Sequence, residues 1–91
     1  MVCADGRCRI SGDVTVDTAG GLLRDLQPEL ARGATTLDFS EVGAADSAAL
    51  ALIFSAMRAA AEHRRTLTCT GLPASFTTLA ELYGVSALLP V

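Results

Sequence analysis

The sequence contains no lysine and no tryptophan, and its seven basic residues are all arginines scattered along 91 residues. The formal net charge is −3. Nucleic-acid binding depends on clustered positive charge that neutralises phosphates, and no such cluster is present. The only aromatic residues are three phenylalanines and one tyrosine, and none alternates with basic residues as a stacking platform for single strands would require. We therefore expect no nucleic-acid partner.

Long apolar runs are also missing. The longest, Ala48 to Phe54, is far shorter than the roughly 20 residues that a membrane-spanning helix needs. The N-terminal stretch MVCADGRCRI contains no apolar segment of the kind found in signal peptides. We expect a cytoplasmic protein.

Cysteine is scarce, and its spacing is uninformative. Cys3, Cys8 and Cys69 are odd in number and form neither a CxxC motif nor a Cys/His ligand pattern. Such spacing favours reduced thiols over a disulfide framework or a zinc site. We expect Cys8 and Cys69 to be small apolar residues in strands, and Cys3 to be a frayed, exposed thiol.

The residues of common catalytic sites are absent or isolated. The single histidine, His63, stands beside Arg64 and Arg65, where we expect a surface imidazole near a helix end. There is no glycine-rich phosphate loop, and Asp38 and Asp46 lack further oxygen ligands at a recognisable spacing. The sequence predicts no catalysis, no cofactor and no metal ion.

The residues that are present predict one small domain, 1–91, of the α/β class. About half of the residues are hydrophobic, enough for a core, and 91 residues are too few for two cores. Strand-like and helical segments alternate in the order β-β-α-β-α-β-α, which predicts a mixed, mostly parallel sheet with helices packed on it. The expected elements are a hairpin of Arg7 to Ser11 with Val14 and Val16 around a Gly12-Asp13 turn, a helix from Thr18 to Gly33, a strand from Thr35 to Phe39, a loop from Ser40 to Ala45, a helix from Asp46 to His63, a strand from Thr66 to Thr70 and a helix from Pro73 to Gly84.

Two further expectations concern the first and last helices. Gly20 and Gly21 weaken the start of the first helix, and we expect it to begin late or to kink at Pro28. In the last helix the periodicity places Tyr83 on the same buried face as Phe76.

The helix from Asp46 to His63 has three distinct faces. Its largest side chains share the face expected to lie on the sheet: Leu50, Ile53, Phe54, Met57 and Ala61. A polar strip is expected to be solvated: Ala51, Ser55, Arg58 and Glu62. The third face is small and apolar, and two interpretations of it stay open. A neighbouring helix would cover Ala49, Ala56 and Ala60, while a partner protein would bind Ala48, Leu52 and Ala59 together with Ser47.

Asp46 and Ser47 stand at the start of this helix and also admit two interpretations. Either residue could simply cap the helix, a common arrangement worth about 1 kcal/mol. A serine hydroxyl at a helix N-terminus could equally be phosphorylated, since the added negative charge suits the helix dipole but repels an acidic or apolar partner. The residues alone do not decide between the two.

A resemblance to a known family changes this balance. The chain shows a strand ending in Asp-Phe-Ser, a short loop, Asp46-Ser47, an apolar helix, another strand and a helix closing on Leu-Tyr-Gly. This pattern resembles the STAS domain of anti-sigma-factor antagonists over nearly the whole chain. The start ISGDV and the ending TLAELYGVSALLP are most similar to the MlaB branch of that family, the small cytoplasmic subunit of the Mla phospholipid-transport ABC complex.

The resemblance implies a non-catalytic protein that binds and supports an MlaF-like ABC ATPase and reaches the inner membrane only through that partner. The implied partner-binding residues are Asp46, Ser47, Ala48, Ala51, Leu52, Ser55 and Ala59. The alternative implied by the family is an anti-sigma-factor antagonist that binds a serine kinase and is phosphorylated at Ser47. Family members usually carry glycine after the hydroxyl residue, whereas this chain has Ala48-Ala49, which leaves less room for close backbone approach.

Overall fold

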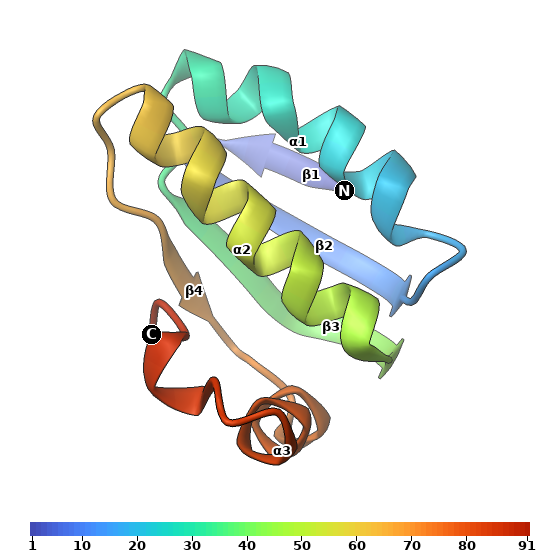
Figure 1. Cartoon of the computed structure of the whole chain (residues 1–91). Coiled ribbons are helices and arrows are strands. Elements are labelled where there is room, and N and C mark those ends of the chain that lie inside the picture. The colour runs from blue at the N-terminus through green and yellow to red at the C-terminus, as the bar shows by residue number, and fades with distance from the viewer.

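The computed structural model describes all 91 residues and confirms the α/β class and the order of the elements (Figure 1). The elements are β1 (Val2–Ala4), β2 (Arg7–Val14), α1 (Ala19–Arg32), β3 (Thr36–Ala45), α2 (Ser47–Glu62), β4 (Thr68–Thr70), α3 (Ala74–Leu82) and a short 3-10 helix, η1 (Ser86–Leu88). No helix has both the length and the apolar character needed to cross a membrane.

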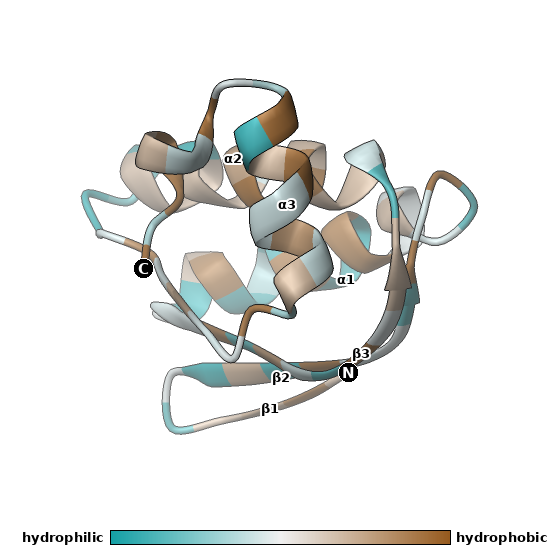
Figure 2. Cartoon of the chain, turned by 90° about the horizontal axis from the view of Figure 1, so that it is seen from below, coloured by the Kyte–Doolittle hydropathy of each residue, from teal (hydrophilic) through white to brown (hydrophobic).

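The four strands form one sheet in the order β1-β2-β3-β4. β1 pairs with β2 antiparallel, and β2, β3 and β4 are parallel to one another, as a mostly parallel sheet requires. The parallel strands are joined through α1 and α2, which lie side by side on one face of the sheet (Figure 1). The edge-on view in Figure 2 shows the helices on one side of the sheet, so its other face is uncovered.

The predicted hairpin turn was wrong. The turn lies at Asp5-Gly6, whose φ angles of 53° and 78° are both positive, as a two-residue type I′ turn requires. Gly12 also has a positive φ, but it sits at a register irregularity inside β2, which continues to Val14 instead of turning back. The positive φ of Gly12, which the sequence predicted for a hairpin turn, is thus used in a β-bulge.

The predicted loop from Ser40 to Ala45 was also wrong, because β3 runs through it. The second half of β3 pairs with the bulged half of β2, and Val14 is in register with Ala45. Asp13 accepts a hydrogen bond from the Ala44 N–H at 2.9 Å. At Gly43 an added Cβ would lie 2.8 Å from that Asp13 carboxylate oxygen, so a larger residue would force the carboxylate to move away from the Ala44 N–H.

Helix α1 begins at Ala19, so the expected late start is not observed, and it continues through Pro28 to Arg32. Thr18 occupies the N-cap position, but its hydroxyl accepts from the Thr15 N–H and donates to the Asp13 carbonyl instead of capping the helix. Gly33 ends the helix as predicted, with a φ of 125°.

The core lies between the sheet and the helices and contains no buried polar side chain. Phe39 and Phe76 pack against each other with ring centroids 5.4 Å apart. In α2 the residues buried are Ala49, Leu50, Leu52, Ile53, Ala56 and Ala60. The Ala49, Ala56 and Ala60 side is therefore covered, and α1 packs against α2, as the neighbouring-helix interpretation expected.

Three residues assigned to the sheet-facing side of α2 are not in the core. Phe54 and Met57 are half-buried, and Ala61 is exposed. The buried side instead includes the small alanines, because α1 packs against α2 and short side chains allow close approach of two helices.

The C-terminal segment packs beside β4. Leu67 and Cys69 are buried as predicted, and the Cys69 N–H donates to the Pro90 carbonyl at 2.7 Å. The prediction for Tyr83 was wrong: α3 ends at Leu82, Tyr83 is its C-cap, and 60% of Tyr83 is exposed. Because the helix ends there, its periodicity no longer sets the direction of this side chain.

The prediction of reduced thiols was wrong for Cys3 and Cys8, although Cys8 lies in a strand, β2, as expected. Cys3 and Cys8 form a disulfide between β1 and β2. Cys69 is a free, buried thiol, as expected. Burial raises the pKa of the Cys69 thiol to about 12.

Candidate functional site

The candidate site is the turn between β3 and α2, where Asp46 acts as the N-cap of α2. One Asp46 carboxylate oxygen accepts from the Ala48 N–H at 2.8 Å, and the other accepts from the Val16 N–H at 3.0 Å. The Asp46 N–H donates to the Val14 carbonyl at 3.3 Å. Asp46 therefore fixes the start of α2 against the segment that follows β2.

Ser47 is the first residue of α2, and it is exposed. Since Asp46 supplies the capping oxygen, the Ser47 hydroxyl is not needed to hold the helix. α2 begins where β2 and β3 end (Figure 1), at the edge of the sheet where ligands of open α/β proteins usually bind. The capping role and the exposed hydroxyl are thus divided between two adjacent residues.

An open groove of about 350 Å³ lies beside Ser47. Two segments distant in sequence form its walls. The residues that line it are Ser47, Leu50, Ala51 and Phe54 from α2 and Tyr83 and Val85 from the end of α3. Most of these side chains are apolar, so the groove offers apolar surface at the edge of the molecule.

The structure separates the predicted partner-binding residues into three groups. Ser47 and Ala51 are exposed on the groove side of α2. Asp46, Ala48, Ser55 and Ala59 are half-buried, and so each presents part of its surface. Leu52 is only 2% exposed and belongs to the core, so its inclusion as a surface residue was wrong.

Two residues that line the groove, Phe54 and Tyr83, were not predicted from the sequence to belong to a surface site. Phe54 was assigned to the sheet and Tyr83 to the core, yet both line the groove. Leu82 precedes Tyr83 in the chain and Leu88 follows Val85 by three residues, and these two leucines are 76% and 60% exposed. The sequence signal was the crowding of large apolar residues around Gly84, more than a short helix end can bury.

The open face of the sheet has a different character. Asp38 lies on this face, and its pKa is lowered because its carboxylate accepts a hydrogen bond from the Ser40 N–H at 2.9 Å, with smaller contributions from the Arg7 and Arg9 charges. Arg7 donates to the Thr70 hydroxyl at 3.3 Å, and Arg9 pairs with Glu41 at 3.7 Å. Arg9 and Glu41 thus pair across the neighbouring strands β2 and β3, whereas Arg7 on β2 reaches past β3 to Thr70 on β4.

A second groove, of about 450 Å³, lies at the opposite end of α2. It is lined by Met57, Ala61, Arg65, Thr66, Leu67, Thr68, Pro90 and Val91. Arg65 is engaged elsewhere, since it donates to the Leu30 carbonyl at 3.0 Å. None of the predicted site residues lines this second groove.

Comparisons with known proteins bear on the fold and the family of this chain. A search of curated proteins finds no match. Among solved structures, the anti-sigma factor antagonist SpoIIAA in its unphosphorylated form is similar, with a TM-score of 0.68 and 15% sequence identity. The match covers 89% of this chain and 73% of that chain, and at this identity it shows a shared fold. A family model described as MlaB, STAS domain, matches residues 3–90. The chain belongs to the STAS-domain family.

Proposed function

We propose that this protein is a non-catalytic, cytoplasmic subunit that binds and supports the ATPase of an Mla-type ABC transporter for phospholipids. STAS domains act through protein–protein contacts, and the family model that matches this chain carries the MlaB description. The protein would lie at the inner membrane only through its partner, and ATP hydrolysis and lipid transport would belong to other subunits.

The observation that carries the proposal is the apolar groove beside the exposed Ser47. Apolar surface that no part of the chain covers is typical of protein-binding sites, and a largely exposed tyrosine is a common anchor residue in interfaces. Tyr83 is 60% exposed at one wall, and Ala51 is exposed at the other. An apolar segment of the ATPase would fill the groove and shield both residues from water.

The small residues around Ser47 favour close contact with a partner. Ala48 is half-buried and Ala51 is exposed. Each carries only a methyl group, so neither side chain projects far from the helix. Ala49, the second residue that replaces a family glycine, is fully buried and does not touch a partner. Of the two departures from the family pattern, only Ala48 therefore alters the surface on which the partner would bind.

Co-purification tests the proposal. Tagged protein co-expressed with the ATPase subunit should retain it, and Ser47→Glu should reduce recovery because the new carboxylate would be desolvated in an apolar interface. The matched control is Ser75→Glu, since Ser75 is also exposed in the first turn of a helix but does not line the groove. Undiminished recovery of the ATPase by Ser47→Glu would contradict docking at this site.

A second candidate function is that of an anti-sigma-factor antagonist switched by phosphorylation. The observation that favours it is the accessible Ser47 hydroxyl at a helix N-terminus, which a kinase could reach without unfolding the helix. Incubation with an anti-sigma-factor serine kinase and ATP should then add the mass of one phosphate to the wild type and none to Ser47→Ala. Absence of added mass in the wild type would exclude this function for the kinase tested.

A further inference from the structure

The Cys3–Cys8 disulfide is held in place by the geometry of the first hairpin. The Asp5-Gly6 turn closes with Ala4 opposite Arg7, which places Cys3 opposite Cys8 in the next pair. Their Cα atoms are 4.0 Å apart, the close spacing of an antiparallel pair that exchanges no backbone hydrogen bonds. The backbone register thus brings the two sulfur atoms together.

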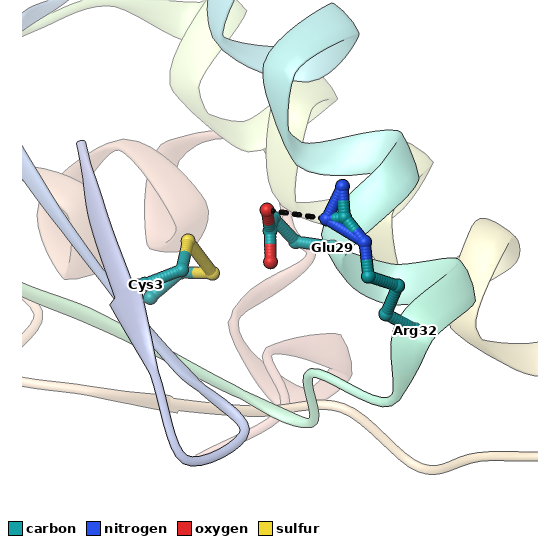
Figure 3. The surroundings of a disulfide bond; sticks show 4 residues. Cys3, Glu29 and Arg32 are labelled. Atoms are coloured by element: carbon teal, nitrogen blue, oxygen red, sulfur yellow. Dashed lines mark hydrogen bonds and ion pairs between the residues drawn. A yellow bond between two sulfur atoms is a disulfide. The ribbon is translucent and has the colours of Figure 1, made fainter.

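The surroundings of the pair differ at its two ends. Cys8 is fully buried, whereas Cys3 is half-buried near the edge of the sheet. From α1 the Glu29 carboxylate approaches the sulfur atoms, and Arg32 pairs with Glu29 at 2.9 Å on the far side (Figure 3). β3 contributes the uncharged Leu37, in register with Cys8.

We propose that Cys3 and Cys8 form a reversible thiol–disulfide exchange site whose reactant is a low-molecular-weight disulfide. The thiolate of Cys3, the more accessible residue, attacks one sulfur of the small disulfide and releases the first small thiolate. Cys8 then attacks the sulfur of Cys3 and releases the second. The pair loses two electrons and two protons, and the small disulfide gains them as two thiols.

The ion pair between Glu29 and Arg32 favours this assignment over a metal site. The three potential ligand atoms of Cys3, Cys8 and Glu29 lie within 4.8 Å of one another. The Glu29 carboxylate, however, is already paired with the Arg32 guanidinium, a positive charge that opposes a cation at the same place. Exchange needs only the two sulfur atoms, and the resulting bond fastens the three-residue strand β1 to β2.

Thiol counting in glutathione buffers of defined oxidised-to-reduced ratio tests the proposal. The full chain is equilibrated, quenched with acid, unfolded, alkylated and weighed intact. In a Cys69→Ala background, both remaining thiols should be alkylated at reducing ratios and neither at oxidising ratios, reversibly. Cys8→Ser in the same background is the control: it keeps the more accessible Cys3 and should form only a mixed disulfide with glutathione. Two alkylated thiols at every ratio would overturn the proposal. Stoichiometric Zn²⁺ that survives dialysis against a chelator and blocks oxidation of the reduced pair would also overturn it.

Glu29 is a positioning residue in this scheme, because its negative charge disfavours a neighbouring thiolate. Glu29→Gln preserves the shape, removes the charge and leaves the Arg32 guanidinium free to attract a thiolate. The pH profile of the oxidation rate of the reduced pair should therefore shift toward lower pH. A purely structural role would leave the profile in place, so an unchanged profile would overturn the role given to Glu29.

Discussion

The two sides of α2 are built from similar residues but meet different surroundings. On one side Ala49, Ala56 and Ala60 are fully buried under α1 and the sheet. On the other side Ala51 is exposed and lines the groove beside Ser47. The same side chain thus serves close helix packing on one side and an open surface on the other. The position around the helix, not the residue type, decides which substitutions the fold tolerates.

The sharpest contrast between the two sides is between adjacent residues. Ile53 is fully buried, whereas Phe54 is half-buried and lines the groove. Ile53→Ala should lower the free energy of unfolding by roughly 2–5 kcal/mol, because it removes buried methylene groups and leaves a cavity. Phe54→Ala should destabilise the fold less although it removes a larger side chain, and it should weaken partner binding more. Equal losses of stability in chemical denaturation would mean that Phe54 is a core residue.

The buried side of the sheet contains a thiol, Cys69, that makes the stability of the fold depend on pH. The Cys69 thiol has a raised pKa of about 12, against 9.0 for an unperturbed thiol, so the unfolded chain loses this proton first. Stability should therefore fall as pH rises from 9.0 toward 12. Denaturation midpoints measured over this range should fall more steeply for the wild type than for Cys69→Ala. Parallel slopes would exclude a contribution from this thiol.

Substitutions of Asp46 and Ser47, at the start of α2, should change stability by an intermediate amount. Asp46→Ala should cost about 1 kcal/mol of stability or slightly more, because it removes the helix cap and also frees the Val16 N–H. Ser47→Ala should stay within about 0.5 kcal/mol of the wild type, since Ser47 holds no part of the turn. Thermal unfolding of the two variants measures this difference, and a large loss for Ser47→Ala would assign it a structural role.

The smallest effect on stability is expected on the exposed side of α2. Ala51→Arg should change the free energy of unfolding by less than about 0.5 kcal/mol, because arginine is a good helix former and the site is exposed. The same variant should recover less ATPase in co-purification, since a long charged side chain would occupy the groove. Full recovery would place the docking surface elsewhere on the molecule.

Local signals in the sequence were sufficient for two of the helix ends. The end of α1 at Gly33 and the start of α2 after Asp46 were predicted, because a glycine with a positive φ and a capping carboxylate act on their own neighbours. The alternation of strands and helices likewise predicted the mostly parallel sheet.

Features that depend on distant contacts could not be predicted from the sequence. Asp5-Gly6 and Gly12-Asp13 contain the same two residue types in opposite order. Only the pairing of β2 with β3 makes the second a bulge. That pairing also extends β3 to Ala45. In the candidate site, helical periodicity grouped Phe54 with Ile53, but only the packing of α2 in the fold decides that Ile53 is buried and Phe54 is half-buried. Ser47 and Ala51 were identified from the chain, whereas Tyr83 needed the fold to bring the end of α3 beside α2.

The hydrogen bond from Cys69 to Pro90 has a consequence for how this chain meets other chains. β4 is an edge strand of three residues, and exposed strand edges are templates for sheet extension and aggregation. With the Cys69 N–H bound by the Pro90 carbonyl, a strand from another protein would have to displace this segment before it could pair there. The β4 edge of the sheet is therefore guarded against intermolecular sheet growth, in contrast to the edge formed by β1.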